Sequence, residues 1–368
     1  MTYLDFGATS LEKPPQVARA VQWAMANCAN PGRGGYKAAE KAAKAVFECR
    51  ERAGRLFGCG PEQVVFTANC THGLNIAIRS VVKPGMKVAI SGFEHNAVTR
   101  PLQTLGVEKI VAGRKLFDWE DAMSRFEDAL KRADAAVFTH VSNVFGYILP
   151  VEEMASLCRS RGIPFIIDAA QSAGSIPVSL EKLGADFIAM PGHKGLLGPQ
   201  GTGLLLCGSA GEPLLVGGTG SESIRQDMPD DLPERLEAGT LNVPGIAGLA
   251  AGLAYLERTG VERIGEKEHR QTLHCADGLE KLGYHVFSGP HQAGTVSFLP
   301  ECDCEEAAEL LASRGIAVRA GLHCAPLAHE SAGTLERGTV RISFGFDAGN
   351  AQTERLLWAV SKGLPRKS

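Results

Sequence analysis

The sequence contains no long apolar segment, no large excess of charge of one sign and no low-complexity tract. No apolar run approaches the ~20 residues that a helix needs to cross a bilayer. Residues 1–6 also lack the cationic and apolar regions of a secretory signal. A formal charge of -3 at pH 7 differs from the basic excess typical of proteins that bind nucleic acid or anionic membranes. We therefore expect a cytoplasmic protein that binds neither nucleic acid nor membrane.

Disulfide and metal frameworks are also missing, because the 10 cysteines are scattered singly along the chain. A chain of this length can fold without disulfide bonds. Cysteines such as Cys49 and Cys158 have apolar neighbours in the sequence, as core residues do. Cys302 and Cys304 make only half a zinc site, since no second pair has suitable spacing. We expect reduced core cysteines, no metal, and a helix N-terminus capped by Asp303.

The overall amino-acid composition is that of an ordinary globular protein. The 368 residues are 44% hydrophobic and 21% charged, and the length leaves room for about two domains. From about residue 64 onward, apolar strands alternate with longer amphipathic helices. This alternation predicts an α/β fold with helices on both faces of a mostly parallel sheet. The expected strands are 64–67, 87–91, 108–112, 135–141, 163–168, 187–190 and 202–206.

The pattern changes after residue 201 to glycine-rich loops, one long helical region (246–283), and then short strands and helices. This second pattern predicts a smaller α+β domain beside the large sheet. The predicted domains are residues 15–245 and residues 246–368, with the N-terminal segment 1–14 packed beside the smaller one.

Two side chains follow apolar strands at the edge where open α/β sheets bind ligands. Asp168 ends one strand, where it either caps the next turn or pairs with a protonated pyridine nitrogen. Lys194 stands between the apolar strand 187–190 and the glycine-rich segment 195–199. It is either a surface lysine or a desolvated amine. In the second case its pKa falls by ~3 units from about 10.4, which requires about 4 kcal/mol.

The segment 67–73 links a strand to a helix N-terminus, where free N–H groups and the helix dipole favour an anion such as a phosphate. Thr71 can add its hydroxyl there. His95 opens the next helix and could stack on a flat ring, although a histidine near a helix cap is an equally good interpretation. Neither feature is specific when it stands alone.

Far downstream, Cys324 in the segment 321–326 offers a thiol, and Arg341 offers a fixed cation in a strand-like segment. A guanidinium can grip a carboxylate with two parallel hydrogen bonds, and a thiolate is a strong nucleophile. Cys324 could also be a small core residue. Combined with Asp168 and Lys194, these are the parts an enzyme needs to hold pyridoxal 5'-phosphate, grip an amino acid and attack its side chain.

The sequence resembles a known family over nearly its whole length, from Leu4 to the last helix. It is similar to the fold-type I, class V aminotransferase-like enzymes, and specifically to the cysteine desulfurases and selenocysteine lyases. The resemblance implies a fold-type I transferase fold, a pyridoxal 5'-phosphate cofactor and a homodimer. The most specific segments occur in order at residues 168–172, 192–194, 237–240 and 319–326.

For the cofactor ring, the resemblance implies that Lys194 holds the cofactor covalently and that Asp168 pairs with the pyridine nitrogen. Gln171 would donate a hydrogen bond to the phenolic oxygen, and His95 would stack on the ring. Both Lys194 and His95 would then belong to the catalytic set.

For the phosphate, the resemblance implies contacts from Cys70, Thr71 and His193. Thr240 would reach the phosphate of the neighbouring subunit. One departure concerns Pro191, because relatives often carry a serine phosphate ligand at that position and proline supplies no donor.

For the substrate, the resemblance implies that Arg341 grips the carboxylate and that Asn143 lines the substrate side. Arg33 and Arg319 would sit at the edge of the site. Cys324 would attack the substrate sulfur. A second departure is Leu322, which stands where related enzymes often have a further histidine beside the thiol.

The function implied is that of a cysteine desulfurase, which converts L-cysteine to L-alanine and leaves a persulfide on Cys324. The short segment between Cys324 and Arg341 favours the SufS-like group, whose thiol loop is compact, and implies a sulfur-acceptor protein. Three alternatives stay open. They are a selenocysteine lyase acting on L-selenocysteine, a class V aminotransferase or β-lyase acting on another amino acid, and a non-catalytic scaffold.

Overall fold

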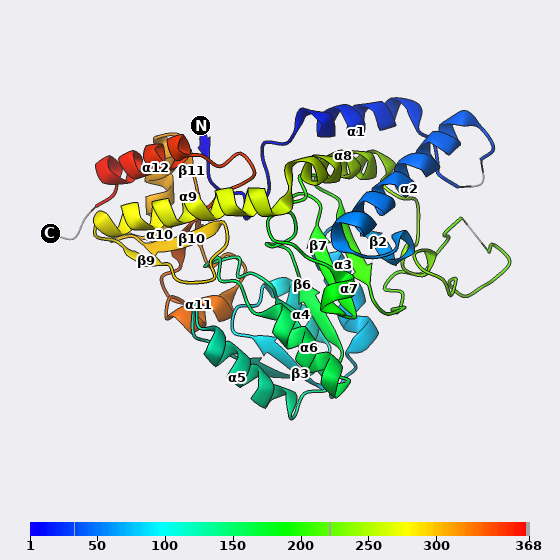
Figure 1. Ribbon diagram of the computed structural model, residues 1–368, viewed down its shortest axis with the longest axis horizontal. Helices are drawn as coiled ribbons and strands as arrows, with labels where there is room; N and C mark the ends of the chain where they lie inside the picture. The colour runs from blue at the N-terminus through cyan, green and yellow to red at the C-terminus, as the bar shows by residue number, and fades with distance from the viewer. Residues whose placement is uncertain (33, 221, 366–368) are drawn as a thin grey trace.

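The computed structural model describes residues 1–32, 34–220 and 222–365, and Figure 1 shows their arrangement. A central seven-stranded sheet carries strands in the order β2-β8-β7-β6-β5-β3-β4. β8 runs antiparallel to both of its neighbours, and the other adjacent pairs are parallel. The predicted mostly parallel sheet is therefore confirmed. The strands are β2 (Val64–Thr67), β3 (Lys87–Ser91), β4 (Glu108–Ala112), β5 (Ala135–Thr139), β6 (Phe165–Asp168), β7 (Phe187–Pro191) and β8 (Gly203–Cys207).

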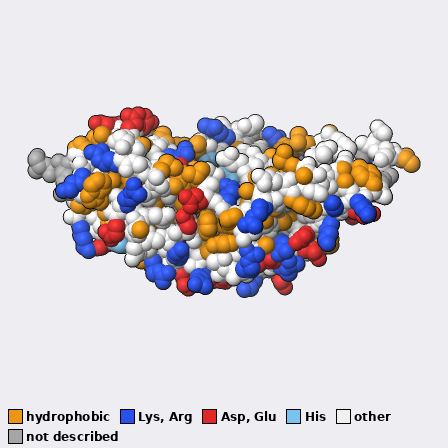
Figure 2. All heavy atoms as spheres, turned by 90° about the horizontal axis from the view of Figure 1, so that it is seen from above, with side chains coloured by type: hydrophobic (Ala, Val, Ile, Leu, Met, Phe, Trp, Pro, Cys, Tyr) orange, Lys and Arg blue, Asp and Glu red, His pale blue; other side chains and the backbone are white. Residues whose placement is uncertain are grey.

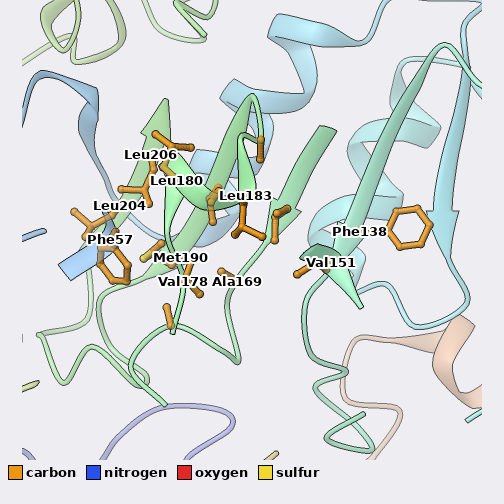
Figure 3. Packing of buried hydrophobic residues seen from close by; sticks show 14 of the residues in the cluster. Phe57, Phe138, Val151, Ala169, Val178, Leu180, Leu183, Met190, Leu204 and Leu206 are labelled. Atoms are coloured by element: carbon orange, nitrogen blue, oxygen red, sulfur yellow. The ribbon is translucent and has the colours of Figure 1, made fainter. Parts of the chain in front are cut away.

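Helices cover both faces of this sheet, as predicted. One face packs on α3 and α4, and the other packs on α2, α5, α6, α7 and α8. The alternation of side chains along a strand produces this division: Leu205 of β8 joins the first layer, whereas Leu204 and Leu206 join the second. Figure 3 shows part of the second layer, with Phe57 and Met190 packed near Leu204. The helices are α2 (Lys37–Phe57), α3 (Cys70–Val81), α4 (Asn96–Thr104), α5 (Trp119–Leu130), α6 (Val151–Arg161), α7 (Leu180–Leu183) and α8 (Val243–Thr259).

A smaller antiparallel sheet has the order β12-β13-β10-β9, and its buried residues pack with α9, α10 and α12. The N-terminal strand β1 (Thr2–Tyr3) pairs in parallel with β11 (Ile316–Ala317). The remaining strands are β9 (His285–Phe287), β10 (Thr295–Leu299), β12 (Arg319–Gly321) and β13 (Thr339–Ser343). The remaining helices are α1 (Pro15–Asn27), α9 (Val261–Lys281), α10 (Cys304–Ser313), α11 (Pro326–Ala332) and α12 (Asn350–Gly363).

Two elements differ from the sequence-based expectation. The long helical region predicted at 246–283 is two helices, α8 and α9, separated at Gly260, whose φ of 86° interrupts the helix. The sequence pattern after residue 283 also predicts one short strand at 316–319, and the structure divides it between β11 and β12, which belong to different sheets. The predicted boundary after residue 245 falls inside α8, and the division into two domains stays a prediction.

Among the helices of the described residues, none combines the length and the apolar character that crossing a lipid bilayer requires. The predicted cap of α10 is confirmed, because the Asp303 carboxylate accepts hydrogen bonds from the N–H groups of Glu305 and Glu306.

A buried ion pair fastens α2 to the edge of the large sheet. The guanidinium of Arg50 donates to both carboxylate oxygens of Glu237 and lies 4.3 Å from the ring centroid of Phe66. One Glu237 oxygen also accepts from the backbone N–H of Phe66, and Arg50 donates to the carbonyl of Val64. Both charged residues are 8% exposed, so each charge depends mainly on its protein partners.

We expect Glu237→Ala to lower the free energy of unfolding by about 3–5 kcal/mol, because it leaves the buried Arg50 charge without a counter-charge and the Phe66 N–H without an acceptor. Urea unfolding at a fixed protein concentration measures this loss. Lys131→Ala removes an exposed ion pair with Asp128 and serves as the control, with an unchanged midpoint. An equally small effect for both variants would contradict the prediction.

Candidate active site

A cavity of about 290 Å³ lies at the carboxyl ends of the parallel strands and is bordered by residues of the smaller sheet. Parallel strands deliver the residues that follow them to the same edge of a sheet, which is why segments distant in sequence meet there. The cavity brings together eleven of the predicted site residues. They are Cys70, Thr71, His95, Asn143, Asp168, Gln171, His193, Lys194, Arg319, Cys324 and Arg341.

Two predicted residues are not in this group. Thr240 lines a separate groove together with residues of α2, outside the cavity of its own chain. Arg33 lies outside the described residues. Their predicted roles stay predictions.

Asp168 is the last residue of β6 and is 3% exposed. One of its carboxylate oxygens accepts from the backbone N–H of Ala170 at 2.9 Å and from the thiol of Cys70 at 3.5 Å. The Cys70 side chain thus contacts the carboxylate. A contact from Cys70 to a phosphate would come from its backbone N–H, at the first position of α3.

Lys194 follows β7 and is half-buried, with part of its surface facing the cavity. Desolvation lowers the pKa of its amine, and the nearby Arg341 cation lowers that pKa further, whereas the Asp168 carboxylate opposes both effects. Desolvation is the cause that the sequence setting indicated. The lowered pKa brings the neutral, nucleophilic amine closer to the working pH.

The N-terminus of α3 faces the same cavity. Asn69 caps this helix, because its side-chain oxygen accepts from the N–H of His72 at 2.9 Å. Thr71 is exposed at the second helical position. An asparagine before a helix is a strong capping signal, so Asn69 could have been identified from the sequence and was missed.

His95 and His193 present rings whose positions are held by hydrogen bonds. His95 caps α4, since its Nδ1 accepts from the N–H of Ala97 at 3.0 Å. Nδ1 of His193 lies 3.1 Å from the Thr9 hydroxyl. Burial lowers the pKa of both rings, to about 4 for His193, so both favour the neutral form at pH 7.

The loop that carries the thiol is held in an unusual conformation. His323 and Cys324 have φ values of 49° and 57°, a left-handed conformation that costs a non-glycine residue about 1–3 kcal/mol. Two hydrogen bonds hold this loop. Asn143 donates its side-chain N–H to the carbonyl of His323 at 2.7 Å, and the backbone N–H of Asn96 donates to the carbonyl of Cys324 at 2.7 Å. The thiol is thus exposed on a fixed loop.

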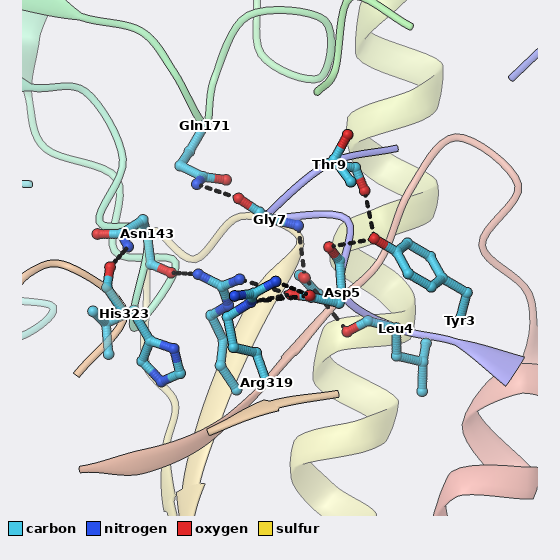
Figure 4. Close-up of polar contacts among 12 residues, drawn as sticks. Tyr3, Leu4, Asp5, Gly7, Thr9, Asn143, Gln171, Arg319 and His323 are labelled. Atoms are coloured by element: carbon cyan, nitrogen blue, oxygen red, sulfur yellow. Dashed lines mark hydrogen bonds and ion pairs between the residues drawn. The ribbon is translucent and has the colours of Figure 1, made fainter. Parts of the chain in front are cut away.

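The N-terminal segment also borders the site, as Figure 4 shows, although no sequence pattern indicated a site role for its residues. The Asp5 carboxylate accepts from Arg319 at 2.8 Å and from Arg341 at 2.8 Å. The carbonyl of Gly7 accepts from the side-chain amide of Gln171 at 3.0 Å. These contacts join segments more than a hundred residues apart, so no local pattern could have indicated them.

The thiols differ in their exposure, so they should differ in their rate of reaction with an alkylating reagent. Cys324 is exposed, whereas Cys28, Cys59 and Cys302 are partly buried, and burial raises the pKa of these three thiols, to about 11 for Cys59. We expect iodoacetamide at pH 8 to modify Cys324 at least about tenfold faster than any of the three. Peptide mapping by mass spectrometry measures the rates, and Cys324→Ala removes the fast phase. If another cysteine were modified faster than Cys324, this prediction would be wrong.

Comparisons with known proteins agree with this geometry. The family described as aminotransferase class-V matches residues 2–356. A "Probable cysteine desulfurase" from Methanothermobacter thermautotrophicus is 33% identical over 90% of this chain and 88% of its own length. A cysteine desulfurase from Thermococcus onnurineus NA1, solved in its apo form, is 33% identical, with a TM-score of 0.90 over 98% of this chain and 94% of that chain. The cysteine desulfurase CsdA from Escherichia coli is 26% identical, with a TM-score of 0.87 and the same coverage. The chain therefore belongs to the class-V aminotransferase family.

Proposed function

We propose that the protein is a cysteine desulfurase that uses pyridoxal 5'-phosphate, moves sulfur from L-cysteine to Cys324 and releases L-alanine. The observation that carries the proposal is that Lys194 and Cys324 line the same cavity of about 290 Å³. An amine that holds an aldehyde cofactor and a thiol that receives sulfur must meet the same substrate molecule. Relatives named cysteine desulfurase support the same reaction.

The residues of the cavity fit this cofactor. Lys194 supplies an amine with a lowered pKa, and Asp168 supplies a buried carboxylate at a strand end for a pyridine nitrogen. The N-terminus of α3, with Thr71 beside it, supplies donors for a phosphate, and His193 lines the same cavity. When bound, the cofactor would supply an electron sink for charge that develops at the substrate α-carbon.

Arg341 and Arg319 provide the cationic end of the site. Arg341 is 2% exposed and donates to the carbonyl of Asn143 at 2.9 Å, so its guanidinium has a fixed orientation. A fixed guanidinium can hold the carboxylate of an amino acid and place its side chain relative to Cys324. Asn143 links Arg341 to the thiol loop, because its carbonyl accepts from Arg341 and its side-chain amide donates to the carbonyl of His323.

The sulfur-transfer step balances with the residues present. The Cys324 thiolate attacks the substrate sulfur, and a sulfur–sulfur bond forms as the substrate carbon–sulfur bond breaks. The electron pair of the broken bond stays with the substrate carbon, which takes up a proton and leaves as part of alanine. The amine of Lys194, at the same cavity, can move the proton at the α-carbon.

The proton of the Cys324 thiol needs an acceptor, and the adjacent His323 is a weak one. Burial, with a further contribution from the Arg341 cation, lowers the pKa of His323 to about 2. Its Nε2 lies 3.2 Å from the Thr339 hydroxyl. A ring with so low a pKa gains little by taking a proton at pH 7, so the amine of the incoming substrate is the better acceptor.

We also propose a homodimer and an acceptor protein. Hydrophobic side chains are exposed near the groove that contains Thr240, including Tyr36 at 56% and Phe47 at 54%. Figure 2 shows hydrophobic side chains at the surface toward the end that carries α1 and α2. A second copy covering this end would bury that surface and bring Thr240 toward the partner's site. The exposure of Cys324 leaves its sulfur open to an acceptor.

We expect the purified protein to show a visible absorption band from the bound cofactor, and Lys194→Ala to lose both that band and all alanine production. The reason is that no other lysine lines the cavity among the residues described. Absorption spectra with and without added pyridoxal 5'-phosphate measure the band. Lys13→Ala is the control, since Lys13 is a partly buried lysine outside the cavity. A wild-type protein that takes up no cofactor would overturn the proposed function.

We expect Cys324→Ser to keep the visible band but to lower alanine production from L-cysteine by at least about a hundredfold, because the hydroxyl is a far weaker nucleophile than a thiolate. Alanine and sulfide are measured under single-turnover conditions, and Cys302→Ser is the matched control. The same assay with L-selenocysteine separates a selenocysteine lyase from a desulfurase. Formation of a keto acid in place of alanine would instead identify an aminotransferase or a β-lyase. Full alanine output from Cys324→Ser would rule out Cys324 as the group that receives the substrate sulfur.

A further inference from the structure

Two arginines stand directly opposite each other in the smaller sheet. Arg319 of β12 and Arg341 of β13 are antiparallel partners in the ladder, so their side chains extend from the same face. Like charges at opposed positions repel each other. Both arginines nevertheless line the cavity, next to Cys324.

A single carboxylate joins these two cations. Asp5 accepts from Nε and Nη2 of Arg319 at 3.0 and 2.8 Å, and its other oxygen accepts from Nη2 of Arg341 at 2.8 Å. Asp5 is 7% exposed, so its charge is compensated by the arginines and not by water. Figure 4 shows Asp5 against the guanidinium of Arg319.

The approach of the N-terminal segment is close and specific. A side chain on Gly7 would come within 3.2 Å of the Arg341 guanidinium carbon, so the backbone itself packs on the cation. The backbone N–H of Gly7 donates to the hydroxyl of Ser343 at 2.7 Å, and this fixes the segment beside β13. The contacts place one negative charge permanently beside two positive ones.

We propose that Asp5 is a specificity-determining residue, which sets the net charge of the substrate-binding end to +1 and thereby selects amino acids that carry one negative group. Two arginines and one aspartate sum to +1, and the α-carboxylate of one substrate molecule neutralises it. A second negative group on the substrate would then find no uncompensated cation. The remaining amine and carboxylate of the cavity, Lys194 and Asp168, serve the cofactor in the proposed function, so they do not enter this sum.

This inference depends on the proposed function, because it assumes that an amino acid binds between Lys194 and Arg341. It concerns which amino acid is accepted. L-aspartate and L-asparagine form a suitable pair of probes, because they have nearly the same shape and differ by one negative charge. Neither probe needs the thiol of Cys324, so binding can be measured apart from sulfur transfer.

The test measures the equilibrium binding of both probes to the cofactor-loaded enzyme by calorimetry. We expect Asp5→Asn to shift the affinity ratio toward L-aspartate by about tenfold, the size expected for one unit charge roughly 10 Å away in a protein interior. Arg319→Gln should shift the ratio about tenfold in the opposite direction. The double variant, Asp5→Asn with Arg319→Gln, restores the sum to +1 and should return the ratio to within about threefold of wild type.

Ser343→Ala is the matched control, since it loosens the same segment without changing any charge, and its ratio should equal that of wild type. If Asp5→Asn does not fold, Arg319→Gln tests the same charge balance from a half-exposed position. An unchanged ratio in the single variants, or a double variant that behaves like Asp5→Asn, would show that Asp5 only orients Arg341 and would overturn the proposal. Failure of the proposed function is distinguishable, because the wild-type enzyme would then release no alanine from L-cysteine.

Discussion

The desolvation of Lys194 is the constraint on which the rest of the site depends. An amine in water keeps its proton near pH 7, and only a surrounding of low polarity and a nearby cation can lower its pKa. Both conditions are met at Lys194, which follows the buried strand β7 and whose pKa is lowered by desolvation and by the Arg341 cation. The same surroundings would destabilise an uncompensated carboxylate, which explains why Asp168 is held by two hydrogen-bond donors.

The charged side chains of the site come from both sheets, and the N-terminal segment joins them. The large sheet supplies Asp168 and Lys194 from its carboxyl edge, whereas the smaller sheet supplies Arg319 and Arg341. Two arginines in register on neighbouring strands repel each other, and this repulsion matters because Arg341 is 2% exposed. Asp5 removes this repulsion, and Gly7 and Thr9 then connect the segment to Gln171 and His193, which follow β6 and β7 of the large sheet.

Most of the fold could be predicted from the sequence because its signals are local. Strands such as 64–67 and 87–91 have the bounds that their apolar pattern indicated, and Asp303 caps α10 as expected. The break at Gly260 was missed, since a glycine within a helical pattern does not say whether the helix continues. The association of Lys194, Cys324 and Arg341 came from their combined chemistry and from resemblance, not from periodicity. The contacts of Asp5 could not be predicted at all, because they join residues separated by more than three hundred positions.

The thiol loop shows how a strained conformation can be kept at a functional site. Left-handed φ values at His323 and Cys324 are unfavourable for side chains with a Cβ atom, so the loop would relax if it were free. It is held by Asn96, which begins the helix that His95 caps, and by Asn143, whose carbonyl also accepts from Arg341. The groups that hold His95 and Arg341 in place therefore also position the thiol. Because these anchors are shared, a shift of the thiol loop would also change the contacts of His95 and Arg341.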